Sequence, residues 1–96
     1  MEEVALQFLT YDEKQKEIVD RFVKIRKSRK ITQKRLSVIS GVSYASVRRF
    51  EESGEISFSS LIKLALALRL YDDLDNLFKI EYEYKSIEKI IRDNKD

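Results

Sequence analysis

The stretch TQKRLSVISGVSYASVRRFE, residues 32–51, contains two short segments of helical character separated by a glycine. Thr32 and Ser43 are residue types that favour the N-cap of a helix, because a side-chain hydroxyl there accepts a hydrogen bond from a backbone N–H of the first turn. Gly41 stands between the segments, where helices commonly end in the left-handed conformation. The pattern predicts one helix from Thr32 to about Ser40 and a second from Ser43 to about Ser53.

The second of these helices has two distinct faces. At about 100° per residue, Val47 and Phe50 lie within about 60° of each other and mark the side that faces a core. Ala45 and Arg49 lie four residues apart and point roughly the opposite way. Small residues at the start of a helix allow close approach to DNA, and an arginine one turn later can fork onto guanine. This outer face is therefore a candidate for reading DNA.

A second interpretation is a solvated face with mixed charges and no partner. The charge distribution argues against it, because residues 21–50 contain ten Lys or Arg and no Asp or Glu, whereas the rest of the chain has nine basic and seventeen acidic residues. Such a block indicates a polyanionic partner. Its members are Arg21, Lys24, Arg26, Lys27, Arg29, Lys30, Lys34, Arg35, Arg48 and Arg49.

The remaining sequence predicts an almost wholly helical chain, since it has no proline and only two glycines. Apolar residues at Ile18, Phe22 and Ile25 have helical spacing. The predicted elements outside the central stretch are a helix from Asp12 to about Arg29, a helix over Phe58–Arg69 capped by Ser57, and a short helix over Asp73–Phe78 capped by Asp72; Gly54 ends the helix that begins at Ser43.

The central stretch resembles the helix-turn-helix of Xre-type regulators, the phage-repressor-like class. The agreement rests on several positions at once: Gln33 at the start of the first motif helix, Leu36, the turn residue Gly41, and the apolar Val47 and Phe50. The likeness extends over about residues 18–78 and implies an all-α, five-helix repressor-like domain. It also implies a structural ion pair between helices, formed by Arg26 and Glu51.

The resemblance assigns roles on DNA to single residues. It implies that Gln33 and Ser43 contact phosphate, and that Tyr44, Ala45 and Arg49 occupy base-reading positions. Arg48 is adjacent and contacts either the backbone or a base. Simpler roles stay open: Gln33 completes a helix N-terminus, Tyr44 covers the edge of the core, and Arg48 pairs with Glu52 four residues later.

Three departures from the family pattern stand out. One residue is inserted between Glu51 and Gly54, which changes the loop after the second motif helix. The acids Glu52 and Glu55 flank that loop and would repel phosphate if they faced it. Arg69 stands where the family usually has a turn glycine.

The flanks divide the chain into an N-terminal extension, residues 1–11, the helix-turn-helix domain, residues 12–78, and a C-terminal extension, residues 79–96. Apolar residues alternate weakly over 4–9 and cleanly over 80–84, which predicts short strands. In one interpretation, residues 80–84 form a strand that pairs with residues 4–9 or with a second subunit, and a helix follows Ser86. In the alternative interpretation, residues 79–94 form one continuous helix. Either flank, or a dimer interface, is expected to cover the apolar Val38.

These observations favour a dimeric transcriptional repressor that binds a double-stranded DNA operator as a homodimer. The alternative is that the chain is the antitoxin of a toxin–antitoxin pair. In this interpretation it is similar to HipB-like antitoxins, which bind a HipA-like kinase as well as their own operator. We expect no catalytic site, cofactor or metal, because the chain lacks Cys and His and shows no nucleophile–base arrangement. No signal peptide or membrane span is indicated, and a cytoplasmic location is expected.

Overall fold

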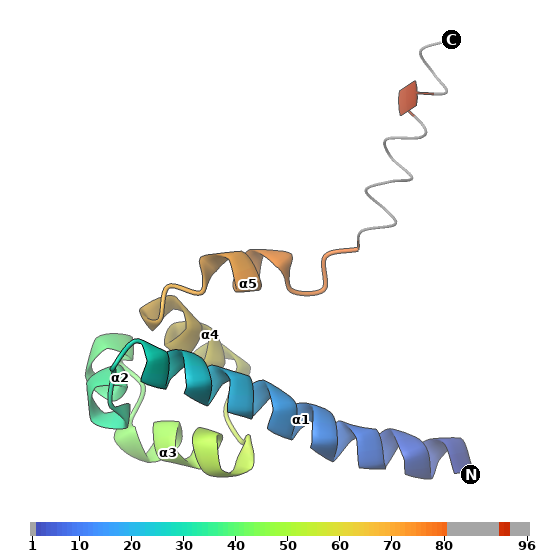
Figure 1. The fold of residues 1–96 in the computed structure, drawn as a ribbon, viewed down its shortest axis with the longest axis horizontal. Coiled ribbons are helices and arrows are strands. Elements are labelled where there is room, and N and C mark those ends of the chain that lie inside the picture. Colours follow the sequence, from blue (N-terminus) through green and yellow to red (C-terminus); the bar gives the residue numbers. More distant parts are fainter. Residues whose placement is uncertain (1, 81–90, 93–96) are drawn as a thin grey trace.

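The computed structural model describes residues 2–80 and 91–92, with side chains from residue 10 onward. The strand expected over 80–84 and the helix expected after Ser86 lie almost entirely outside these residues. The described chain forms five helices: α1 (Glu2–Ser28), α2 (Gln33–Ser40), α3 (Tyr44–Ser53), α4 (Phe58–Ala67) and α5 (Tyr71–Asn76) (Figure 1). The all-α fold with five helices is therefore confirmed, and the described part contains no strand.

The first helix differs from its prediction, because it begins at Glu2 rather than near Asp12. Residues 4–9 are helical, so the strand predicted there is wrong. Leu, Ala and Gln in this segment are good helix formers, and neither Gly nor Pro interrupts the chain before the apolar stripe of α1. The extension also fails to cover Val38, which is 72% exposed.

The predicted caps of α2, α3 and α4 are present. Thr32 Oγ1 accepts from the Arg35 N–H at 3.0 Å, and Ser43 Oγ accepts from the Ser46 N–H at 3.1 Å. Ser57 Oγ accepts from the Ser60 N–H at 3.1 Å. Each helix thereby satisfies one N–H that has no partner within the helix. Both glycines end helices as predicted, with φ of 75° at Gly41 and 79° at Gly54.

The end of α4 and the start of α5 differ from their predictions. α4 stops at Ala67, and Arg69 then adopts a φ of 59°, the left-handed conformation for which the family usually supplies glycine. Asp72 is not the N-cap of α5, because Leu70 occupies that position and makes no side-chain capping bond. Asp72 instead lies in the first turn, where an acid interacts favourably with the helix dipole.

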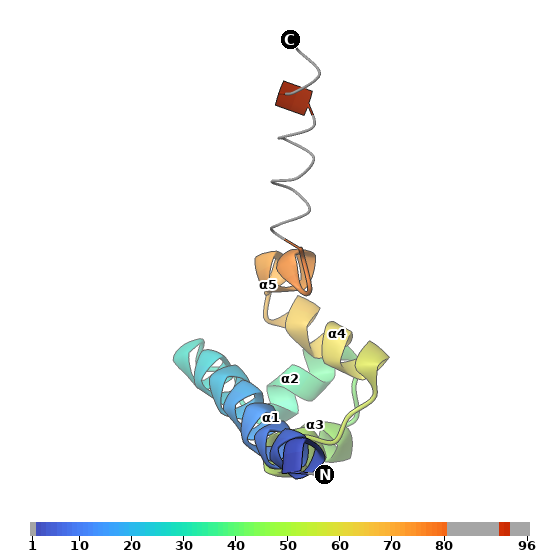
Figure 2. The same ribbon diagram turned by 90° about the vertical axis from the view of Figure 1, so that its right-hand side faces the viewer.

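The core lies where α1, α3 and α4 meet around α2. Leu36 of α2, Val47 of α3 and Leu64 of α4 are fully buried, and Leu68 is 1% exposed. Figure 2 shows α2 between α1 and α4, with α3 below α2 and α4. Each fully buried aliphatic side chain contributes about 1.5–3 kcal/mol of hydrophobic stabilisation, so this small cluster fixes the angle at which α3 is presented. In the described part of the chain, no helix is long and apolar enough to cross a membrane.

Candidate nucleic-acid interface

Helix α3 is held in the domain by its inner face. Val47 is fully buried and Phe50 is 3% exposed, which confirms the core face expected from the helical wheel. The Phe50 ring meets the Phe22 ring of α1 edge to face, with 5.1 Å between centroids. Aromatic pairs in this geometry contribute about 0.5–1.5 kcal/mol beyond their buried area. The opposite face of α3 is thereby left in solvent.

The inner end of α3 is also fixed by a buried ion pair with α1. Glu51 accepts from Arg26 Nε and Arg26 Nη2 at 2.7 Å each, and these side chains are only 5% and 9% exposed. Arg26 Nη1 donates to the Ile31 carbonyl at 2.9 Å. This is the pair of residues that the family resemblance implies, in the bidentate geometry that Arg and carboxylate favour.

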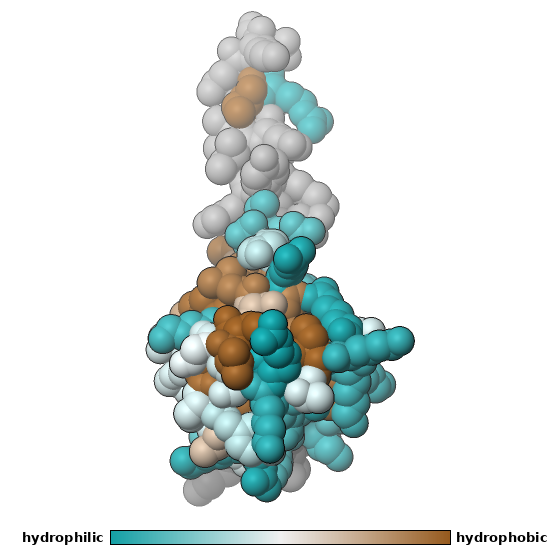
Figure 3. All heavy atoms as spheres, turned by 90° about the vertical axis from the view of Figure 1, so that its left-hand side faces the viewer, coloured by the Kyte–Doolittle hydropathy of each residue, from teal (hydrophilic) through white to brown (hydrophobic). Residues whose placement is uncertain are grey.

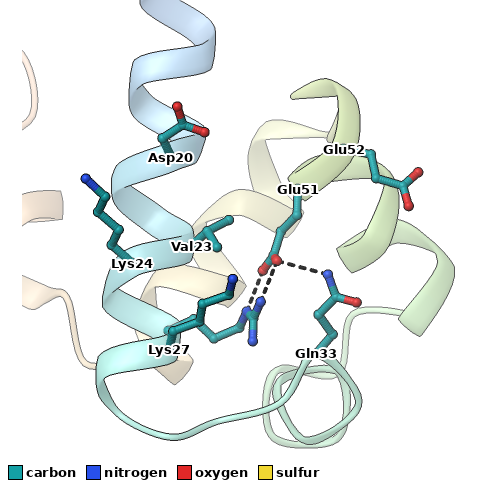
Figure 4. Close-up of a pocket in the computed structure, with 8 residues that line it drawn as sticks. Asp20, Val23, Lys24, Lys27, Gln33, Glu51 and Glu52 are labelled. Atoms are coloured by element: carbon teal, nitrogen blue, oxygen red, sulfur yellow. Dashed lines mark hydrogen bonds and ion pairs between the residues drawn. The ribbon is translucent and has the colours of Figure 1, made fainter.

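Gln33, expected to contact phosphate, belongs to the same cluster. Its Nε2 donates to Glu51 Oε1 at 2.9 Å, and Figure 4 shows its amide pointing toward the Glu51 carboxylate while Glu52 points away. The side chain is half-buried and lines an open groove of about 500 Å³ between α1, α2 and α3. The Nε2 group has two N–H donors, so a second one is available for another acceptor. Gln33 therefore couples the start of α2 to the end of α3.

The exposed face of α3 carries the other residues expected to contact DNA. Tyr44, Ala45, Arg48 and Arg49 are all exposed. They lie on one side of the helix that Val47 and Phe50 anchor from the other side. The structure therefore brings the candidate base-reading residues together on one accessible surface.

The two neighbouring arginines of this face differ in their contacts. The Arg48 guanidinium lies 5.7 Å from the centroid of the Tyr44 ring, and its Nη2 is 3.5 Å from Glu52 Oε1. The Arg49 guanidinium has no hydrogen bond, ion pair or ring contact to any described residue. Arg48 is thus oriented along the flank of α3, whereas Arg49 extends into solvent without a partner in the described chain.

Lys34 joins this surface although the sequence pattern did not single it out. Its Nζ lies 5.8 Å from the centroid of the Tyr44 ring, so two cations approach the same aromatic side chain. Cation–π contacts at exposed sites contribute about 0.5–1 kcal/mol each. The only sequence signal for Lys34 was its membership in the acid-free basic block. It adds a cation from α2 at the start of α3.

The loop after α3, which follows the inserted residue, contacts α1. The Gly54 carbonyl accepts from Gln15 Nε2 at 3.0 Å. Glu52 and Glu55 are exposed, and Glu52 is the partner of Arg48. One of the two unexpected acids therefore lies beside a cation of the candidate interface.

Further cations lie at the corner between α1 and α2. Arg29, Arg35 and Arg69 line an open groove of about 330 Å³ with Ile31 and Ile39. The face of the molecule on the α2 side accordingly shows apolar side chains interrupted by hydrophilic ones (Figure 3). The basic block of the sequence is thus distributed over several surfaces around α2, and the outer side of α3 is one of them.

Comparison with known protein families identifies the family to which this fold belongs. A family model described as Helix-turn-helix matches residues 23–74, which is more than half of the chain. The chain therefore belongs to the Xre-type helix-turn-helix family, and the fold and the family agree. The protein is a DNA-binding transcriptional regulator whose partner is double-stranded DNA. Comparisons with curated proteins and with solved structures give no match.

Proposed function

We propose that the protein is a dimeric repressor that reads its operator with α3 in the major groove. The observation that carries this proposal is the exposed outer face of α3, where an arginine with no partner among the described residues follows a small residue by one turn. Ala45 lets the helix approach the base pairs closely, and Arg49 supplies the donors for a bidentate contact to guanine. In a two-fold dimer, the two α3 helices meet half-sites one helical turn apart, about 34–36 Å.

The other residues of the interface position the helix on the backbone. Gln33 offers its second amide N–H to a phosphate while the first holds Glu51. Ser43 contacts phosphate at the N-terminus of α3, although its hydroxyl already donates to Ser46 Oγ at 2.8 Å. Tyr44 lies beside Lys34 and Arg48 and reads a base edge or fixes these cations on the backbone. Such phosphate contacts set the register without carrying sequence information.

The first test is the affinity for DNA measured against salt concentration. The probes are the DNA upstream of the protein's own gene and an operator selected from random duplexes. Each phosphate that the protein neutralises gives a slope of about −0.9 in log affinity against log salt concentration, so we expect a steep negative slope. Affinity that does not change with salt would contradict the proposal.

The second test separates the two arginines of α3. Arg49→Ala should cost about 1–3 kcal/mol on the operator and relax the preference at one base pair. Arg48→Ala is the matched control, because it removes the neighbouring cation that Tyr44 and Glu52 hold along the flank. A loss for Arg49→Ala that is equal on all sequences would assign Arg49 to a phosphate instead of a base.

A second candidate function is that of an antitoxin, which binds a HipA-like kinase in addition to its operator. It is favoured by large apolar side chains exposed around α5: Leu77 is 48% exposed and Phe78 is 90% exposed. Such a cluster suits a protein contact. A kinase-like reading frame beside the gene, whose product co-purifies with this chain but not with a Phe78→Glu variant, would support this function. A gene without such a neighbour would argue against it.

A further inference from the structure

Helix α1 is longer than the domain that supports it. Gln15 of α1 donates to the Gly54 carbonyl in the loop after α3, and Val19 is the first described residue of α1 in the buried core. Figure 1 shows the N-terminal half of α1 extending past the end of α3. An isolated helical segment of this length is marginal in water and is usually stabilised by packing of an apolar face. We therefore expect the projecting half of α1 to pack against a partner surface.

An apolar strip continues along α1 beyond the core. Tyr11 is 59% exposed and Ile18 is 50% exposed, although both are large apolar side chains. Tyr11 lines a hollow of about 440 Å³, which shares Gln15 and Ile18 with an adjoining hollow of about 280 Å³. Phe58, 66% exposed at the start of α4, lines the far end. Together these residues, which we call the α1 groove, form a surface that suits a helix.

The sequence spacing of the strip is that of a helix pair. Val4, Phe8, Tyr11, Gln15 and Ile18 follow one another at alternating intervals of four and three residues. This is the a/d spacing of a seam between two packed helices. The same spacing continues to Phe22 and Ile25. There it serves the protein's own core, where Phe22 is buried and Ile25 packs against the buried cluster. At Gln15 the seam meets the loop after α3, whereas Tyr11, the described seam residue before it, is 59% exposed.

We propose that the α1 groove binds α1 of a second copy of this chain. Helices that carry the same seam complement each other through a two-fold axis, which makes the contact closed and self-limiting. From Glu2 to Ile18 the helix is about 25 Å long at 1.5 Å per residue, which is enough for two heptads. The side chains beside the seam have mixed charge, with Lys14 paired to Glu17 at 3.1 Å, so they select neither an acidic nor a basic partner.

This interface supplies the dimer on which the proposed repressor depends, and none of its residues belongs to the candidate DNA-reading face of α3. The test is sedimentation equilibrium of the full chain at micromolar concentrations. The wild-type chain should sediment at twice its mass of 11.4 kDa. Tyr11→Glu and Ile18→Glu should each raise the dissociation constant of the dimer by about 100-fold or more, since each places a charge at the centre of the seam in both copies.

Phe78→Glu is the matched control, because it changes an even more exposed aromatic residue on a different surface. It should leave the dimer intact. Tyr11→Ala is the second variant, for the event that Tyr11→Glu disturbs the helix itself. Cooperative unfolding in urea shows whether each variant is folded. A monomeric wild-type chain, or a dimer that Phe78→Glu dissociates and Tyr11→Glu does not, would overturn the proposal.

The DNA measurement distinguishes this proposal from the proposed function. A monomeric Tyr11→Glu protein should bind a single half-site as well as the wild-type protein and lose only the gain in affinity on the two-fold operator. If the wild-type chain is a dimer that binds no operator, the repressor function fails while the interface stands. If operator binding persists and the seam variants remain dimeric, the interface fails while the function stands.

Discussion

The cluster of Arg26, Glu51 and Gln33 makes the stability of the domain depend on one carboxylate. Glu51 accepts three hydrogen bonds, two from Arg26 and one from Gln33. In Glu51→Ala, the buried guanidinium keeps only its bond to the Ile31 carbonyl. The charge cannot relax into solvent at low cost, because the Arg26 side chain is only 9% exposed. The variant therefore leaves a buried charge without its counter-ion.

Removing one partner of a buried ion pair costs about 3–5 kcal/mol. Small domains have total stabilities of about 5–15 kcal/mol, so Glu51→Ala should remove a large fraction of the stability of this domain. At about 4–8 °C per kcal/mol for a domain of this size, the melting temperature should fall by about 12 °C or more. Replacing both charges, as in Arg26→Met with Glu51→Leu, should restore part of the loss because it leaves no charge unpaired.

Urea unfolding followed by circular dichroism measures these changes, and Glu52→Ala is the matched control. Glu52 is the next residue of the same helix, but its pair with Arg48 spans 3.5 Å and both side chains are more than half exposed. Exposed i,i+4 pairs contribute about 0.3–0.5 kcal/mol, so the control should unfold close to the wild-type midpoint. If Glu51→Ala costs less than about 1 kcal/mol, the buried pair does not stabilise the domain as the geometry indicates.

Three smaller predictions follow from the caps and the core, each measured by urea unfolding. Ser43→Ala should cost about 1 kcal/mol through loss of the N-cap, and a variant as stable as wild type would show that the Ser46 N–H finds another acceptor. Gly41→Ala should cost about 1–2 kcal/mol from its φ of 75° alone, because a Cβ there meets no atom within 4 Å; a neutral result would contradict that conformation. Leu36→Ala should cost about 2–5 kcal/mol, whereas Val38→Ala on the same helix should stay within about 0.5 kcal/mol; equal losses would mean that another surface covers Val38.

Local signals in the sequence were sufficient to predict the two helices and the turn of the helix-turn-helix. Thr32, Gly41 and Ser43 act within one turn of their own positions, so their roles can be inferred without knowing the fold. Val47 and Phe50 follow from helical periodicity alone. The partnership of Arg26 with Glu51 spans twenty-five residues and was accessible only through the family resemblance.

Features that depend on packing between helices could not be predicted from the sequence. The position of Lys34 near the Tyr44 ring depends on how α2 meets α3, and no local pattern encodes that contact. Gln33 was expected to face DNA, yet its bond to Glu51 exists only because α3 brings that carboxylate to the start of α2. The N-terminal extension was predicted as a strand because weak alternation over six residues resembles helical spacing.

The stretch from Arg48 to Glu52 shows how helical geometry divides like residues between structure and recognition. Glu51 is buried in the ion pair, whereas Glu52 is exposed beside Arg48; Arg48 lies along the helix flank, whereas Arg49 extends into solvent. A turn of about 100° per residue is enough to place neighbours in different environments. The buried acid fixes the end of α3, and the ring of Tyr44 and the second acid hold one arginine on the flank. The remaining arginine is then presented from a rigid helix, so that little conformational entropy is lost when it contacts a base.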